Sequence, residues 1–503
     1  DQRAVRAREI DGHAGTTRTD LALGAVTRAA GVAIDFAGTN GTLGGGAGSP
    51  NVTSSGAFPG ASNGILPWAT VNGTSWAENN SNSVRAFSGS FVNPTTVATD
   101  TTAQAQLSGA GTLASAKGFN SLNVVATAPG QSFTLNSGAS LNLSAGAVLK
   151  SGADAYSIVG SGTLGAGTAG AGTELISHVD GGTLTIGAPL NTAILGIAKG
   201  GTGTLVLAGS RAGTMSGNIS IAGGQLEFQG ASTTLSGVVS GAGGLTVNLN
   251  PGQTLTFSNN SNSYAGPTIV KGGYLANSAY TNIGLPGGNY QTAPSTNTSV
   301  IGTNLVLQGG AYAPAYTFSK DLGPGPNQVQ ILSGTSGFVN TAQGGGAVGF
   351  TLDSGRELVW GSTYFQPTVF VISLNNGANV TCTLANNFDF TGSTRTFLVG
   401  DAAYDASATG VMALSGVIRT SSGTAGLTKI GRDELQLSGA STYNGATTVS
   451  EGTLSFTGNA NVASPNPLGQ SSAAAANLLL ANNTTLKYAG TGGSTDRGFT
   501  ISG

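Results

Sequence analysis

Charged side chains that could form a catalytic pair occur in two short stretches of the chain. Asp353, Arg356 and Glu357 lie in LDSGRELVW, and Asp401 and Asp405 lie in GDAAYDAS. Enzymes that cleave polysaccharides use paired carboxyl groups, or aspartate-bound calcium beside an arginine or lysine base. The same residue types are also typical of turns and of solvated ion pairs. We interpret both stretches as turns and predict no catalytic residue in them.

A serine nucleophile would need a histidine beside it, and the chain has two histidines. His13 lies in a charged stretch, and His178 lies in ELISHVDGGTL, which is typical of a strand and a turn. The patterns G-x-G-x-x-G, from Gly160 and Gly165, and G-x-S-x-G, from Gly60, are expected by chance in a chain with 83 glycines. None stands between a strand and a helix, as those motifs require. We predict no enzyme active site and no cofactor.

Four large residues raise the alternative of a binding surface or a buried packing role. Trp68, Trp76, Trp360 and Phe365 could form a face that stacks on carbohydrate, but large aromatic residues mainly bury area, so we favour packing. Cys382 is the single cysteine, which excludes an internal disulfide, and its place in NVTCTL predicts a small buried side chain. Calcium-binding nonapeptide repeats are absent, and we predict no metal site.

The first twenty residues hold eight of the 40 charged residues. A solvated leader or cap explains this concentration. The alternative is an arm, with Arg3, Arg6, Arg8 and Glu9 as candidate contacts, that docks on the end of another copy of the chain. Because the chain starts without Met, we expect a segment that was processed or cut from a larger protein.

Charged residues are otherwise scarce, at 8% of the chain against roughly 25% in ordinary soluble domains. Ser, Thr, Asn and Gly fill the polar positions, which suits strands with a wet but uncharged outer face. The formal net charge of −2 provides no basic surface for nucleic acid. No apolar stretch reaches the ~18 residues that span a bilayer. We therefore expect no nucleic-acid partner and no membrane insertion.

One tripeptide recurs along the chain and usually opens an alternating run of residues. Gly-Thr-Leu begins at Gly41, Gly111, Gly162, Gly182, Gly203 and Gly452. Glycine adopts turn conformations that other residues resist, Thr starts a strand, and Leu points inward. The tripeptide therefore predicts a turn followed by a strand.

A longer unit of three short strands contains some of these turns. It appears as KGGTGTLVLAGSRAGTMSGNISIAGGQLEF from Lys199, GGLTVNLNPGQTLTFSNNSNSYAGPTIVKGGYL from Gly243 and GLTKIGRDELQLSGASTYNGATTVSEGTLSF from Gly426. Tyr264 and Tyr443 hold the same place before a glycine corner. Tight turns without helical crossovers predict one turn of a parallel β-solenoid in each unit. A sandwich would need hairpins, and a sheet with helices would need helical periodicity, which is almost absent.

The segment from Gly426 resembles the autotransporter-associated β-strand repeat, whose pattern is roughly G-L-T-K-x-G-x-G-x-L-x-L-S-G-x-N-x-Y-x-G-x-T-x-V-x-x-G-x-L. Arg432 and Asp433 replace the usual Gly-Ala, and the other two segments match more weakly. The stretches from Ile65 and Gly309 are similar to those between such repeats in giant bacterial surface proteins. The resemblance implies secretion and a passenger-like β-helix.

We therefore predict an all-β fold, a right-handed parallel β-helix forming a single elongated rod. We expect a charged leader or cap with the first irregular turns at 1–105, solenoid turns at 106–280, irregular spacer turns at 281–415 and a final solenoid at 416–503. The predicted function is a structural or adhesive protein of a bacterial cell surface, with polysaccharide or other copies of the chain as partners. Two alternatives stay open: a fibre subunit joined end to end by strand addition, and a β-helix lyase or hydrolase acting on polysaccharide.

Overall fold

Short β-strands make up nearly all the regular structure of the described residues. The computed structural model describes residues 20–28, 30–37, 43–44, 49–167, 173–209, 213–259, 261–277, 303–314, 318–340, 350–374, 381–400 and 410–502. Within them, the helical elements are two 3-10 turns, η1 (Asp353–Gly355) and η2 (Ala475–Asn477). The chain divides into unit 1, residues 1–246 and 261–266, and unit 2, residues 247–260 and 267–503.

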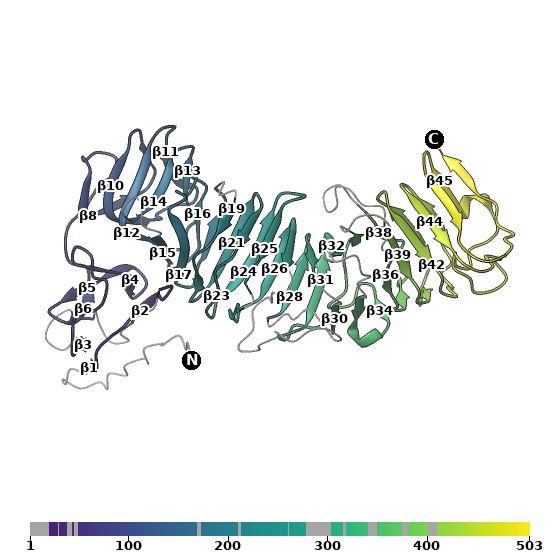
Figure 1. Ribbon diagram of the computed structural model, residues 1–503, viewed down its shortest axis with the longest axis horizontal. Helices are drawn as coiled ribbons and strands as arrows, with labels where there is room; N and C mark the ends of the chain where they lie inside the picture. The colour runs from purple at the N-terminus through teal and green to yellow at the C-terminus, as the bar shows by residue number, and fades with distance from the viewer. Residues whose placement is uncertain are drawn as a thin grey trace. The chain divides into compact units, whose positions relative to one another are not determined.

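Unit 1 is built from two stacks of parallel strands that the chain visits in turn (Figure 1). The β12 sheet contains β7 (Phe91–Val92), β8 (Asp100–Ser108), β10 (Lys117–Val125), β12 (Ser140–Ser151), β15 (Thr173–Val179), β17 (Ile194–Gly200), β20 (Ile219–Ile221) and β23 (Val239–Ser240). The β13 sheet contains β9 (Gly111–Leu113), β11 (Gln131–Leu135), β13 (Tyr156–Gly160), β16 (Thr183–Ile186), β18 (Thr204–Leu207) and β21 (Gln225–Gly230). Strands β19 (Gly213–Met215) and β22 (Thr233–Leu235) pair at a third side.

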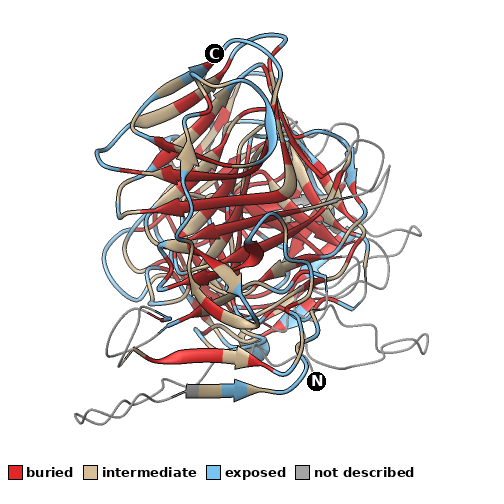
Figure 2. Ribbon diagram, turned by 90° about the vertical axis from the view of Figure 1, so that its left-hand side faces the viewer, coloured by how far each residue is buried: buried red, intermediate tan, exposed pale blue. Residues whose placement is uncertain are grey.

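Successive turns of unit 1 stack in register, so that like residues lie above one another. Leu184 pairs with Leu205, and Leu205 pairs with Leu226 on the next strand. All three side chains are fully buried. Each strand hides alternate residues inside the coil, and each turn shields the apolar interior of its neighbour. Figure 2 shows this pattern, with buried residues along the strands and exposed residues mainly in the loops.

Five of the six Gly-Thr-Leu tripeptides open strands as predicted, and the first two residues of the sixth, 41–42, lie outside the described residues. Gly182 precedes β16 with a φ of 59°, and a Cβ there would collide with the carbonyl oxygen of Ala153 in the preceding turn. Gly452 precedes β44 (Thr453–Phe456) with a φ of 63° and faces the carbonyl oxygen of Arg432 in the same way. Glycine is required at these corners because both the backbone conformation and the close passage of the next turn exclude a side chain.

Unit 2 contains four stacks of parallel strands. The β41 sheet contains β25 (Thr254–Phe257), β27 (Tyr274–Asn277), β29 (Ala311–Ala313), β32 (Thr335–Asn340), β35 (Val369–Leu374), β38 (Arg395–Leu398), β41 (Leu427–Ile430), β43 (Thr447–Val449), β45 (Leu478–Ala481) and β47 (Thr500–Ser502). The β42 sheet contains β30 (Phe318–Lys320), β33 (Phe350–Leu352), β36 (Thr381–Leu384), β39 (Val411–Leu414), β42 (Glu434–Leu437), β44 and β46 (Thr485–Tyr488). Strands β34 (Leu358–Val359), β37 (Phe388–Asp389) and β40 (Ile418–Arg419) form a short third stack, and β26 (Thr268–Gly272), β28 (Leu305–Gln308) and β31 (Val329–Ser333) form a fourth.

In unit 2, too, the inward-facing side chains of successive strands stack above one another in columns. Cys382 pairs with Met412, and Met412 pairs with Leu435, all with fully buried side chains. The buried position of Cys382 confirms the predicted packing role. Also in unit 2, Trp360 packs against Phe365 and Phe397, and the ring centroids are 5.2 and 5.6 Å from that of Trp360. Aromatic residues fill the wider turns, where aliphatic side chains alone would leave voids.

The nine strands of the three predicted repeat units are present. Eight of their marker residues are buried, and Ile269 is the exception because its neighbour Val270 points inward instead. The predicted all-β parallel solenoid is therefore confirmed within each unit. The right-handed winding, the single rod and the four segment boundaries stay predictions.

The described strands between residues 20 and 86 form a separate small sheet. We call it the N-terminal sheet, with strand order β1-β3-β6-β5-β4-β2. Its strands are β1 (Asp20–Leu23), β2 (Ile34–Phe36), β3 (Asn51–Ser54), β4 (Ile65–Val71), β5 (Ser75–Asn80) and β6 (Ser83–Ala86). Strands β4, β5 and β6 pair antiparallel. The β4–β5 turn contains Asn72 and Gly73 with φ of 52° and 69°, which is typical of a tight hairpin.

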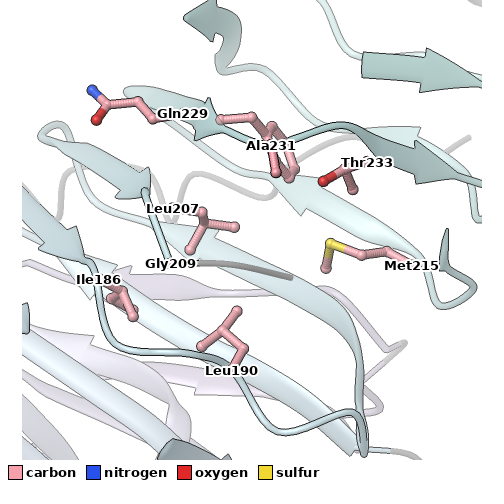
Figure 3. Close-up of a pocket in the computed structure, with 9 residues that line it drawn as sticks. Ile186, Leu190, Leu207, Gly209, Met215, Gln229, Ala231 and Thr233 are labelled. Carbon is pink, nitrogen blue, oxygen red and sulfur yellow. The ribbon is translucent and has the colours of Figure 1, made fainter. Parts of the chain in front are cut away.

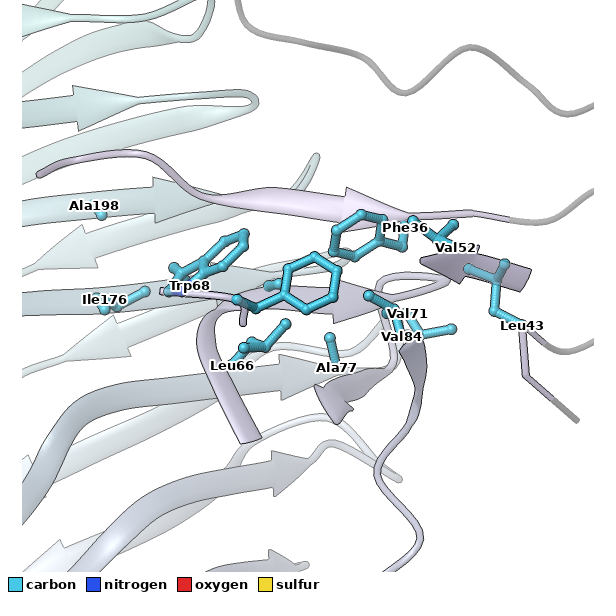
Figure 4. Close-up of a cluster of buried hydrophobic side chains, with 12 residues drawn as sticks. Phe36, Leu43, Val52, Leu66, Trp68, Val71, Ala77, Val84, Ile176 and Ala198 are labelled. Carbon is cyan, nitrogen blue, oxygen red and sulfur yellow. The ribbon is translucent and has the colours of Figure 1, made fainter. Parts of the chain in front are cut away.

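The N-terminal sheet packs against the outer face of the β12 sheet. Trp68 and its apolar neighbours form one cluster with Ile176 on β15 and Ala198 on β17 (Figure 4). A second cluster joins Trp76 to Leu149 on β12. Because both faces of these solenoid strands are covered, β17 is buried along most of its length instead of alternating.

Polar contacts fix the position of the N-terminal sheet on the solenoid. The fully buried Asn120 accepts hydrogen bonds from Ser62 Oγ at 2.7 Å and Asn63 Nδ2 at 3.0 Å, and its own amide donates to Gln104 Oε1 at 3.0 Å. Glu174 on β15 pairs with Arg28 at 2.5 Å. A buried amide with all these partners satisfied favours one docking geometry over others.

Candidate functional site

Buried lysines link neighbouring turns of the solenoid. Lys199, at the end of β17, is fully buried. Its Nζ donates to the carbonyl oxygens of Gly200 at 3.0 Å, Gly201 at 2.8 Å and Gly223 at 2.9 Å. Gly223 belongs to the following turn of the coil. The ammonium group therefore bonds the corners of two stacked turns to each other.

Two other lysines repeat this geometry. Lys150 donates to the carbonyl oxygens of Gly152 and Gly181, each at 2.5 Å. Lys429 donates to the carbonyl oxygen of Gly431 and, at 2.8 Å, to that of Glu451.

All three lysines follow one rule of spacing. Each reaches the carbonyl oxygen two residues further along its own chain. Each also reaches the carbonyl oxygen two residues beyond its register partner on the next strand, and these partners are Val179 for Lys150, Ile221 for Lys199 and Val449 for Lys429. We call these three contacts the lysine staples.

The lysine staples are electrostatically costly because the charged group has left water. Burial lowers the pKa of Lys199 to about 7. Burial likewise lowers the pKa of Lys429 to about 8, against the opposing attraction of Asp433 and Glu451. Three carbonyl acceptors around Lys199 match the three N–H donors of an ammonium group, which compensates part of the lost hydration.

Sequence reasoning missed these lysines, although a signal was present. Each stands in a Lys-x-Gly tripeptide, at the position of Lys in the G-L-T-K-x-G opening of the repeat pattern. The signal is incomplete, because Lys271 has the same spacing and is exposed on β26, where Val270 occupies the inward position. The alternation along the strand decides which lysine enters the corner.

The first predicted charged stretch lies on the surface of unit 2. Asp353 pairs with Arg356 at 2.6 Å within the η1 turn. Asp353 and Ser354 have φ of 50° and 52°, a left-handed conformation that is uncommon outside glycine. Ser354 Oγ donates to Asp321 Oδ1 at 2.5 Å, and the backbone N–H of Leu322 donates to Asp353 Oδ1 at 3.3 Å. The turn is thus tied to the loop after β30.

Glu357 forms a second link between stacked turns. Arg419 on β40 donates to both of its carboxylate oxygens, from Nε at 2.6 Å and from one terminal nitrogen at 2.5 Å. The same guanidinium pairs with Asp389 on β37 at 3.1 Å. Burial alone would raise the pKa of Asp389, but hydrogen bonds from Thr391 and Ser421 and the charge of Arg419 lower it. Glu357 and Asp389 therefore share one guanidinium, and the lowered pKa of Asp389 favours its ionised form.

Two hollows adjoin at this charged turn, and we call them together the spacer groove. One, of about 320 Å³, has Lys320, Asp321, Asn327, Gln328 and Ser354 in its wall. The other, of about 550 Å³, has Asp353, Arg356, Glu357, Ser362 and Tyr364 in its wall. They meet where the loop after β30 bonds to η1. The spacer groove combines hydroxyl, amide, carboxylate and cationic groups in a shallow surface.

A third hollow is apolar and small. It has about 20 Å³ of free space and lies in unit 1 among Leu207, Met215 and Phe228 (Figure 3). Met215 stands before a glycine corner, the place that Tyr264 and Tyr443 fill in the other repeats. The hollow has room for roughly one water molecule. It is a packing defect left by a smaller side chain.

The three tryptophans do not offer a stacking surface, which corrects that reading of Trp68, Trp76 and Trp360. Their exposed fractions are 5%, 0% and 1%. The indole N–H groups of Trp68 and Trp360 donate to the carbonyl oxygens of Pro59 and Pro367, each at 2.8 Å. Burial of these large side chains stabilises the N-terminal sheet and the spacer turns.

The remaining candidate residues either lie outside the described part of the chain or are buried. The candidate docking arm of Arg3, Arg6, Arg8 and Glu9 lies outside the described residues, as do His13, Asp401 and Asp405. His178 is buried against Thr70 of the N-terminal sheet, and burial lowers its pKa to about 4. Among the described residues, no group of three or more His, Cys, Asp or Glu side chains could hold a metal ion.

Comparison with known proteins identifies the repeated turns. A family model described as the passenger-associated-transport-repeat matches residues 197–228, 252–276 and 427–456. Three segments of the chain are therefore similar to this repeat family. These matches coincide with the three repeat units and include two of the lysine staples, at Lys199 and Lys429. They confirm the resemblance that the segment from Gly426 indicated.

The chain is also similar to a curated protein, the "Adhesin BmaC autotransporter" of Brucella suis biovar 1 (strain 1330). The two are 29% identical over 332 residues, which is 64% of this chain and 9% of the relative. The chain thus spans less than a tenth of that protein's length. Both findings support a secreted or cell-surface location. No solved structure matched the chain. No described helix is long and apolar enough to cross a membrane.

Proposed function

We propose that this chain is a non-catalytic adhesive segment of a bacterial surface protein. The observation that carries the proposal is the coincidence of passenger repeats with stacked, lysine-stapled solenoid turns. Such turns provide a rigid scaffold whose side surfaces are free to vary. A protein similar to this chain is named as an autotransporter adhesin, which favours adhesion as the use of that scaffold.

The charge arrangement in the spacer groove favours binding over catalysis. A general acid that cleaves a glycosidic bond must keep its proton near neutral pH, which requires a raised pKa. Asp353 and Glu357 are instead paired with arginines, and the pKa of Asp389 is lowered. We therefore propose an adhesive role without turnover of polysaccharide. Assembly of the chain with copies of itself stays a prediction.

An adhesion assay tests this proposal. Latex beads coated with the full chain are applied to cultured epithelial cells under flow, beside beads coated with albumin and beads coated with the heat-unfolded chain. We expect the folded chain alone to retain beads. Equal retention of beads with all three coatings would contradict the adhesive function. Release of reducing sugar from polysaccharides incubated with the chain would contradict its non-catalytic part.

A further inference from the structure

We propose that the spacer groove binds a neutral glycan chain. This inference rests on the proposed adhesive function and adds the place of binding and the chemical class of the ligand. The groove is the part of unit 2 where two hollows adjoin and where polar side chains from several separate turns converge. Convergent polar groups in a depression are the usual mark of a binding site.

The hydrogen-bonding groups of the spacer groove suit a polyhydroxylated ligand. Carboxylates accept from hydroxyl groups, while Gln328 and Ser362 can both donate and accept. Sugar hydroxyls also do both, and adjacent hydroxyls can meet one carboxylate with two bonds. Tyr364 is half-buried at the rim of the larger hollow. Its ring supplies the apolar surface on which a sugar ring can pack.

The charges of the spacer groove favour a neutral ligand over an acidic one. Asp321, Asp353 and Glu357 line the groove with the two cations Lys320 and Arg356. Glu357 also pairs with Arg419, which is shared with Asp389, so that four carboxylates in all stand against three cations. Both lining cations already have partners, because Lys320 Nζ donates to Asn327 Oδ1 at 2.7 Å and Arg356 pairs with Asp353. An anionic polysaccharide would have to break these contacts and approach the excess of negative charge, which is unfavourable.

The walls of the spacer groove are held in place before any ligand arrives. The left-handed turn at Asp353 and Ser354 is fixed by its bonds to Arg356, Asp321 and Leu322. On the other wall, the carbonyl oxygen of Tyr364 accepts from the backbone N–H of Ile331 at 2.9 Å. The next residue, Phe365, is buried against Trp360. Fixed side chains lose little conformational freedom on binding, which favours affinity.

Affinity electrophoresis of the full chain tests this inference. Native gels contain dextran, mannan or galactan as neutral polymers, and hyaluronate or heparin as acidic ones. We expect retardation by at least one neutral polymer, and about tenfold weaker binding for Tyr364→Ala, the loss of one aromatic packing contact. Tyr488→Ala is the matched control, because Tyr488 is an exposed tyrosine of β46 outside the groove.

The outcomes separate this inference from the proposed function. No retardation by the three neutral polymers, retardation by acidic polymers alone, or equal effects of the two tyrosine variants would each overturn the glycan inference. Beads that adhere to cells equally well with wild type and Tyr364→Ala would leave the adhesive function in place and exclude the groove. Circular dichroism of both variants shows that each has kept its β-structure.

Discussion

The Nζ atom of Lys199 lies 2.9 Å from the carbonyl oxygen of Gly223, on the next turn of the solenoid. A buried amino group thereby joins two corners of the coil, and Lys199 and Gly223 are 24 residues apart in the sequence. Lys150 and Lys429 make the same contact in their own turns. The parallel solenoid has no compact single core, so bonds between neighbouring turns contribute directly to its stability.

Replacing Lys199 or Lys429 with methionine tests the lysine staples. Methionine keeps the length of the side chain but leaves buried carbonyl oxygens without their donor, which costs about 1–3 kcal/mol. We expect each variant to unfold at lower urea concentration than wild type. The matched control is Lys271→Met, which removes an exposed lysine with the same Lys-x-Gly spacing. An equal loss of stability in the control would contradict the staples.

The pH dependence of stability gives a second test at Lys199. Its pKa is about 7 in the folded chain, against an ordinary value of 10.5. Between these values the unfolded chain binds more protons, so stability must rise with pH, by at most about 1.4 kcal/mol per unit. Three carbonyl acceptors favour the ammonium form and make the rise smaller. We expect the stability difference between wild type and Lys199→Met to grow from pH 7 to pH 10; a constant difference would show that the pKa is not lowered.

A comparison of two glycines distinguishes the cost of a left-handed backbone from the cost of a steric collision. Gly452 and Gly458 have φ of 63° and 79°, but a Cβ would collide with Arg432 O at Gly452 and would meet open space at Gly458. A left-handed non-glycine residue costs about 1–2 kcal/mol. We expect that loss for Gly458→Ala and a larger loss for Gly452→Ala, measured by urea unfolding. Equal losses would mean that the turns are not tightly stacked at Gly452.

Trp68 provides a test of the docking of the N-terminal sheet. Truncating a buried tryptophan to alanine costs about 3–5 kcal/mol. We expect Trp68→Ala to increase hydrogen exchange in β4 and on the covered strands β15 and β17. Strands β42 and β44 of unit 2 serve as internal reference and should exchange as in wild type. Unchanged exchange at β15 would show that the N-terminal sheet does not cover that strand.

The repeats predicted the solenoid because their signals are local. Alternation of apolar residues places Leu205 and Leu226 inside, and the glycine before each strand marks the corner. The hairpin at Asn72 and Gly73 has a local signal of the same kind, because Asn-Gly is typical of a two-residue hairpin turn.

Contacts between distant turns could not be predicted from the sequence. Glu357 and Arg419 are 62 residues apart, and their pairing depends on how many residues each intervening turn contains. The outward face of β17 is buried because the N-terminal sheet covers it, which no property of β17 itself specifies. The spacer groove could not be predicted for the same reason. Its walls come from loops that are distant in the sequence, and the stacking of the turns determines which loops lie next to each other.

The most direct test of the stacked repeats is disulfide trapping across one turn. Thr204 and Gln225 are register partners on β18 and β21, about 4.8 Å apart in a parallel sheet and within reach of a disulfide. We predict that the Thr204→Cys, Gln225→Cys double variant crosslinks on mild oxidation, while Thr183→Cys with Gln225→Cys, two strands apart, does not. Crosslinking of the second pair and not the first would contradict the parallel solenoid register on which the account depends.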